Sequence, residues 1–376
     1  MTHGRCVALL ACIAGCIAPP PPPARPPDAC VILQAPVSGP MATERTAAGD
    51  APLALANLFV REARLTGDAG FYTLADTALT CALSRSPDDR EAERLRAHVW
   101  IQFHRFAEVE VLAQRLAAAE GAGWFDHALL GDAHMEQGEL DAAGEAYQRA
   151  VDLRPSLEVY DRIGWLRWSW GDVDGAVAMQ EMAVSAGSPL DPEPYAWVLT
   201  RLGWLHALRG QPAPELDAAL ALLPDYKPAR FARGRVRLHE GHPGAADDLR
   251  AVGATVEAVW ALSELDPSVS IEAVKAQDPR GYAIWLTPRD PAAALVILDD
   301  EWKVRQDATT RMARAWAAQR AGDTSRDVSA EARAALATGI VEPRVLWMGA
   351  QILGDDTLRQ RALAMGPGLL PSERRP

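Results

Sequence analysis

The sequence predicts an all-α protein. From Ala51 onward, apolar residues recur with the 3.6-residue period of amphipathic helices almost without interruption. Alternating runs of β-branched residues, which indicate strands, are absent. Glycines such as Gly138, Gly171 and Gly210 divide the helical stretches into pairs, which indicates helical hairpins. Because one hairpin cannot bury its own apolar face, a stack of hairpins is expected.

The clearest hairpin lies at 124–157. Its two helical patterns, 124–137 and 140–153, are separated by Gly138. Gly131 in the first helix and Ala143 in the second lack bulk, so the two backbones can approach closely where they cross. This spacing resembles the 34-residue tetratricopeptide repeat, with matching residue types at Leu130, Gly131, Gly138, Ala143, Tyr147, Ala150 and Pro155.

The resemblance implies a tetratricopeptide-like α-solenoid, a right-handed superhelix of antiparallel hairpins. About six hairpins are expected at 51–258, followed by a degenerate helical region at 259–366 and a disordered tail at 367–376. Asp-Pro and Asp-Pro-Arg-Gly sequences suggest an irregular connection at 266–290. Regular helices are expected again at 291–305, 307–321, 326–338, 344–353 and 357–364.

The chain begins with a short apolar run that resembles a bacterial lipoprotein signal peptide, 1–15. The sequence Ile13-Ala14-Gly15-Cys16 resembles the lipobox, which implies that Cys16 is acylated. A plain secretory signal or a chance apolar start are the alternatives. Residues 16–50 contain five consecutive prolines and predict a Pro-rich tether. Ile17 is not the Asp that favours inner-membrane retention, so the outer membrane, on its periplasmic side, is expected.

The amino-acid composition restricts which classes of partner are expected. The 38 basic and 50 acidic residues give a net charge of −12, which argues against a nucleic-acid partner. Two cysteines, Cys30 and Cys81, remain after the signal and the lipid site. An exported protein can join them in a disulfide, and the alternative is that Cys81 is a small buried apolar residue.

The sequence lacks the common catalytic motifs. It has no phosphate-binding GxxxxGK[ST], no GxGxxG, no GxSxG and no CxxC. His239 and His242 flank a turn and are interpreted as solvated. His127 and His134 stand at aromatic positions of the repeat and are interpreted as packed rings. We therefore expect no catalytic residue, no metal site and no small-molecule cofactor.

Tryptophan is unusually frequent, with twelve residues in the chain, and this excess bears on function. In the family that the chain resembles, the first helix of each hairpin lines a ligand groove. Counting from the register glycines predicts that this groove is lined by Phe125, Met135, Trp165, Trp168, Trp197, Arg201, Trp204, Phe231 and Arg235. Arg201 and Arg235 are expected at its edge, facing a partner's carboxylate. The alternative is that the rings pack between adjacent first helices.

These observations favour a non-enzymatic scaffold, anchored to the cell envelope by a lipid, that binds a protein or peptide partner in its groove. One alternative is an envelope enzyme with a site in 259–305, where Asp, Glu and Arg occur without His or Cys. The other is a structural spacer without a specific partner.

Replacing Cys16 tests the anchor. Several acyl chains at about 0.8 kcal/mol per buried CH₂ make spontaneous release from a membrane negligible. We expect Cys16→Ser to move the protein from the membrane fraction to a soluble or unprocessed form, measured by immunoblotting of cell fractions. A mutant that stays in the membrane fraction would contradict lipidation.

Overall fold

The computed structural model describes Cys30 and residues 51–374, and within these residues it contains helices and no strand. The predicted all-α class is confirmed. The predicted signal peptide, Cys16 and, apart from Cys30, the predicted tether lie outside the described residues. None of the described helices combines the length and apolarity that crossing a bilayer requires.

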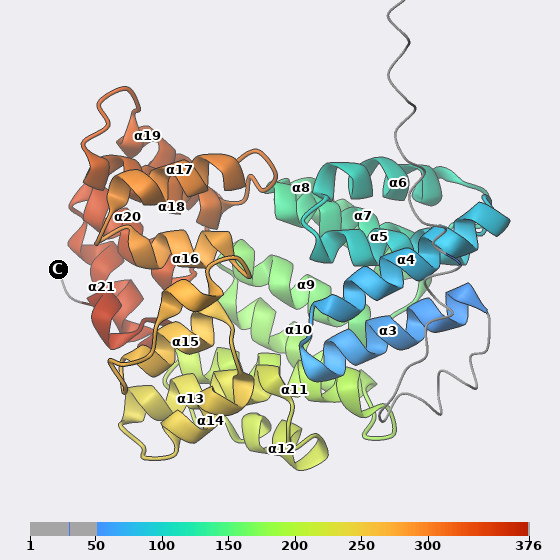
Figure 1. Cartoon of the computed structure of the whole chain (residues 1–376), viewed down its shortest axis with the longest axis horizontal. Helices are drawn as coiled ribbons and strands as arrows, with labels where there is room; N and C mark the ends of the chain where they lie inside the picture. Colours follow the sequence, from blue (N-terminus) through green and yellow to red (C-terminus); the bar gives the residue numbers. More distant parts are fainter. Residues whose placement is uncertain (1–29, 31–50, 375–376) are drawn as a thin grey trace, which may run out of the picture.

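Six helical hairpins follow one another in the order that the sequence predicts (Figure 1). They are α3 (Pro52–Thr66) with α4 (Gly70–Arg85), α5 (Arg90–Gln102) with α6 (Phe106–Ala118), α7 (Trp124–Gln137) with α8 (Leu140–Leu153), α9 (Leu157–Ser169) with α10 (Val173–Ala186), α11 (Pro192–Leu208) with α12 (Pro214–Leu222), and α13 (Lys227–Glu240) with α14 (Ala245–Val252).

The third hairpin shows why small residues are needed where helices cross. A Cβ atom on Gly131 would lie 2.3 Å from Cε1 of Tyr147, far inside van der Waals contact. Tyr147 is 2% exposed, so its ring fills the space that Gly131 leaves. Gly138 ends α7 with φ of 79°, a left-handed conformation that glycine adopts without strain.

The C-terminal region is also helical. It comprises α15 (Val256–Ser263), η1 (Ile271–Val274), α16 (Pro279–Leu286), α17 (Pro291–Glu301), α18 (Ala308–Ala321), α19 (Val328–Leu336), α20 (Pro343–Leu353), α21 (Asp356–Ala364), η2 (Gly366–Gly368) and η3 (Pro371–Arg374).

Two Asp-Pro pairs in this region start helices, so α16 interrupts the irregular connection expected at 266–290, whereas Asp266-Pro267 lies in a turn. Asp278 accepts a hydrogen bond from the Gly281 backbone N–H at 3.0 Å, and Pro279 occupies the first turn of α16. Asp290 caps α17 in the same way, 3.0 Å from the Ala293 nitrogen. Proline fits there because the first helical N–H groups have no partner within the helix. The prediction treated Pro279 as a breaker and missed its capping aspartate, whereas Pro291 begins α17 where a helix was expected.

Contacts between distant hairpins close the stack on itself (Figure 1). Arg64 in α3 pairs with Glu193 in α11 at 2.6 Å, so the first hairpin contacts the fifth. After α17, Arg305 pairs with Glu136 of α7 at 3.1 Å, which joins the C-terminal region to the third hairpin. The superhelix is therefore compact, and its two ends both contact its middle.

Residues 367–374 are packed, whereas the sequence analysis expected a disordered tail at 367–376. Leu369 and Leu370 are 2% and 1% exposed. The segment η2 lies against α11 and α13. The prediction gave weight to the prolines and arginines of this segment and overlooked that two adjacent leucines supply enough apolar surface to dock it.

A disulfide joins Cys30 to Cys81 of α4, with the two Cα atoms 5.1 Å apart. This settles the choice that the sequence left open. Cys81 is also 1% exposed, so both of its expected properties, burial and pairing, occur together. Cys30, which belongs to the predicted tether, is thereby bonded to the first hairpin.

Enlarging Gly131 tests the hairpin crossing. Gly131→Leu drives a branched side chain into the Tyr147 ring, and overpacking of this kind costs about 1–3 kcal/mol. We expect the free energy of unfolding, measured by urea titration with circular dichroism, to fall by that amount. The control Ala118→Leu adds the same side chain at an exposed end of α6 and should change stability little. Equal effects of the two changes would argue against a close crossing.

Candidate functional site

The nine side chains predicted to line the groove differ widely in exposure. Trp165 is 41% exposed. Five are partly buried: Phe125, Trp197, Arg201, Trp204 and Phe231. Three are buried, Met135 at 7%, Trp168 at 2% and Arg235 at 5%. The prediction that all nine line an open groove is therefore wrong for these last three, which are too buried to contact a partner directly.

Trp165, Trp197, Arg201 and Asp161 form one ordered group on α9 and α11, called here the Trp165 cluster. The Arg201 guanidinium lies 4.4 Å from the centre of the Trp165 ring and 5.6 Å from that of Trp197. These two rings from adjacent hairpins therefore lie on either side of one guanidinium group. Each contact is a cation–π interaction, so Arg201 links the two indoles.

Asp161 organises the Trp165 cluster. It accepts a hydrogen bond from Trp197 Nε1 at 2.9 Å and lies 3.4 Å from Arg201 Nε. Gln180 of α10 donates to it at 2.9 Å. Arg201 is therefore already paired, which corrects the expectation that it waits at an edge for a partner's carboxylate. The part of the cluster that a partner can contact is the exposed ring of Trp165, which packs against Arg201.

Trp168 and Trp204 belong to a covered part of the same face. They share an apolar cluster with Val341 and Met365 from the C-terminal region. These two residues approach because the chain returns across the hairpins after α19. The sequence register identified the correct face of each helix, but it could not reveal that the chain's own C-terminal part covers half of that face.

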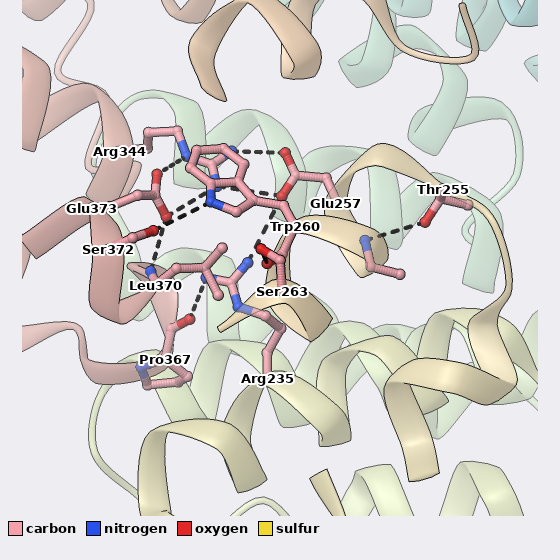
Figure 2. A network of polar contacts seen from close by, with 11 residues as sticks. Arg235, Thr255, Glu257, Trp260, Ser263, Arg344, Pro367, Leu370, Ser372 and Glu373 are labelled. Atoms are coloured by element: carbon pink, nitrogen blue, oxygen red, sulfur yellow. Dashed lines mark hydrogen bonds and ion pairs between the residues drawn. The ribbon is translucent and has the colours of Figure 1, made fainter. Parts of the chain in front are cut away.

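Arg235 binds the C-terminal segment rather than a partner. Its Nη2 donates to the carbonyl oxygen of Pro367 at 2.7 Å, and its Nη1 lies 3.9 Å from Glu257 (Figure 2). Its guanidinium also lies 5.9 Å from the Trp204 ring and 5.8 Å from that of Phe231. Arg235 therefore does recognise a carbonyl-bearing peptide segment in the predicted groove, but the segment belongs to the same chain.

Arg344 joins α15, α20 and η3 (Figure 2). It donates to Glu257 at 2.8 Å and to both carboxylate oxygens of Glu373. Burial alone would lower the pKa of Arg344, but the carboxylates of Glu257 and Glu373 outweigh burial and raise it. Trp260 Nε1 donates to Ser372 Oγ at 3.3 Å in the same network. The C-terminal segment is thus held by charge as well as by its leucines.

A further polar group lies where α7, α8 and α9 meet. Tyr147 donates to Asp132 at 2.8 Å, and Arg162 Nε reaches the same carboxylate at 2.8 Å. Nearby, burial and the charges of Arg64 and Arg162 lower the pKa of His98 to about 4, so His98 is neutral at pH 7. The signal available in the sequence was Asp132, one position after the register glycine, facing a tyrosine of the next helix.

The histidines singled out in the sequence have ordinary partners. His239 lies 3.0 Å from Arg374, and His242 accepts from the Gly244 backbone at 3.0 Å. His134 pairs with Glu139 at 2.6 Å. Glu110, His134 and Glu139 place one ligand atom each within 4.8 Å of one another, a grouping the sequence did not predict. Gln137 donates to Glu110 at 2.8 Å, so hydrogen bonds already use this group.

One family model agrees with the repeat assignment at the third hairpin. The profile of the tetratricopeptide repeat matches residues 127–156, the hairpin on which the resemblance was first seen. A chain of the APC/C hetero-tetramer Cut9–Hcn1 is 12% identical, with a TM-score of 0.45, and the match covers 90% of this chain and 59% of that chain. The TPR domain of P58(IPK) is 12% identical, with a TM-score of 0.23 and coverage of 82% and 91%. No curated protein sequence matches this chain.

Truncating the two tryptophans of α9 separates the exposed position from the buried one. Trp168→Ala removes a fully packed indole, and such changes cost about 3–5 kcal/mol. Trp165→Ala removes an exposed ring and one cation–π contact, worth about 1 kcal/mol or less. Urea unfolding should therefore show a large loss for Trp168→Ala and a small one for Trp165→Ala. Similar losses would mean that Trp165 is a core residue too.

Proposed function

We propose that this tetratricopeptide-repeat protein is a non-enzymatic adaptor of the bacterial cell envelope, which binds a segment of a partner protein on the Trp165 cluster. The observation that carries the proposal is the exposure of Trp165, 41%, on a base fixed by Arg201, Trp197 and Asp161. Tryptophans with a rigid surround are enriched among the residues that dominate binding energy.

The cluster favours a partner segment with an apolar side chain. The ring of Trp165 offers wide apolar area, while Arg201 and Asp161 largely neutralise each other. Charge is therefore not the main source of affinity at this position. A partner with a single leucine or aromatic anchor, flanked by polar residues, suits a ring that is exposed on one side only.

The disulfide supports export. Disulfides persist in oxidising compartments such as the bacterial periplasm and are rare in the cytosol. The pairing of Cys30 with Cys81 therefore agrees with the signal sequence ahead of it and with acylation of Cys16. The outer membrane remains part of the proposal on the strength of Ile17 alone.

No specific observation favours either alternative function, the envelope enzyme or the structural spacer. The region 259–305, considered for an enzyme site, contributes Trp260, Ile284 and Arg289 to a cavity whose lining contains no histidine or cysteine. A structural spacer would have no use for a partly exposed indole held by a cation and a carboxylate. We therefore retain the adaptor as the proposed function.

Photocrosslinking in cells tests the adaptor function. We expect p-benzoylphenylalanine at position 165 to give a discrete crosslinked product in the cell envelope. The matched control is position 182 on α10, because Met182 is also 41% exposed but lies on a second helix. Crosslinks at neither position, or the same products at both, would contradict binding at the Trp165 cluster.

A further inference from the structure

A cavity of about 340 Å³ lies in the C-terminal region, apart from the Trp165 cluster. Helices α15, α16, α18 and α20 contribute to its walls, and η3 closes one side. Three indoles line it, Trp260, Trp316 and Trp347, which are 4%, 8% and 5% exposed. This volume and this apolar lining are typical of sites for small organic molecules.

The charged residues of the lining are predominantly cationic. Arg344 is neutralised by Glu257 and Glu373. Arg289 and Arg320 are exposed, and neither forms an ion pair with a carboxylate among the described residues. The cavity therefore presents the positive charge of Arg320 and that of Arg289, on which the carboxylate of Glu264 also acts, beside its apolar walls.

The same residues disfavour a cationic ligand. Two of the indoles already make cation–π contacts with arginines. The Arg344 guanidinium lies 4.7 Å from the centre of the Trp260 ring, and that of Arg320 lies 5.9 Å from the centre of the Trp316 ring. A ligand cation would have to displace an arginine and approach the other. An anion with an apolar body does not have to displace an arginine, and the other arginine attracts it.

One donor in the wall lacks an acceptor. Trp316 Nε1 is buried and makes no hydrogen bond with any described atom, whereas Trp260 Nε1 donates to Ser372. Buried polar groups are nearly always paired in folded proteins, so Trp316, which lines the cavity, carries one donor that the protein itself leaves unmatched.

We infer that this cavity binds a small organic acid with a flat apolar body and one carboxylate, the body lying among the indoles and the carboxylate facing Arg289 and Arg320. The inference does not depend on the adaptor function, because the two sites share no residue. It adds a small-molecule ligand that the sequence analysis did not anticipate.

Calorimetry with three related probes tests the ligand class. The full-length protein is titrated with 2-naphthoate, with the neutral 2-naphthamide and with the cation 2-naphthylmethylamine. We expect 2-naphthoate to bind with one-to-one stoichiometry. The amide and the amine should bind at least about tenfold more weakly, because a charge-assisted hydrogen bond contributes roughly a factor of ten in affinity. Absence of 2-naphthoate binding, or equal binding of all three probes, would overturn the inference.

Variants locate the binding. Arg320→Gln should weaken 2-naphthoate binding about tenfold and leave 2-naphthamide binding unchanged. Arg333→Gln, an exposed arginine of α19 outside the lining, is the matched control and should change neither. Gln351→Trp, which fills the cavity from α20, should abolish binding of both probes while the circular dichroism spectrum stays that of the wild type.

Two results would refute the assignment. The first is an equal loss of 2-naphthoate affinity in Arg320→Gln and Arg333→Gln, which would show that general surface charge is responsible. The second is a peptide ending in tryptophan that binds much more tightly than 2-naphthoate at the same arginine, which would assign the cavity to a protein terminus.

Discussion

Close approach of paired helices is the constraint on which the rest of the structure depends. At Gly131 there is no room for even a methyl group beside Tyr147. The same requirement recurs at Gly164, where an added Cβ would lie 2.7 Å from Gln180, and at Gly203, where it would lie 2.9 Å from Leu216. These three glycines therefore set how closely the two helices approach in the third, fourth and fifth hairpins, and the last two of these hairpins carry Trp165 and Trp197.

Local features of the fold could be predicted from the sequence because they depend on neighbouring residues. The six hairpins, and the shortened second helix of the fifth, follow from helical period and glycine spacing. The long-range features could not. Nothing near Arg64 indicates that it will meet Glu193, and nothing near Pro367 indicates that Arg235 will bind its carbonyl. Residues with conflicting local signals were misread for the same reason, as with Asp278-Pro279, where a capping aspartate outweighs an apparent breaker.

In the candidate site too, local features could be predicted from the sequence and long-range contacts could not. Register counting placed all four tryptophans of α9 and α11 on the helix faces directed to the inside of the stack, and it brought Trp165 next to Trp197. It could not separate Trp165 from Trp168, because the difference is made by Val341 and Met365, which are more than 170 residues further along the chain. The residue that fixes the open half, Asp161, was not predicted, since its role depends on Trp197 and Arg201 of the next hairpin.

The closure of the stack on itself affects how the chain acquires its structure. In an open array each repeat contacts only its neighbours, so folding can start anywhere and spread along the chain. Here, pairs such as Arg64 with Glu193, and Arg235 with Pro367, form only after long loops have closed, and the entropy of those closures is lost before the contacts form. The early repeats can form their local contacts first, but the complete structure has to wait until residues 367–374 are available to dock.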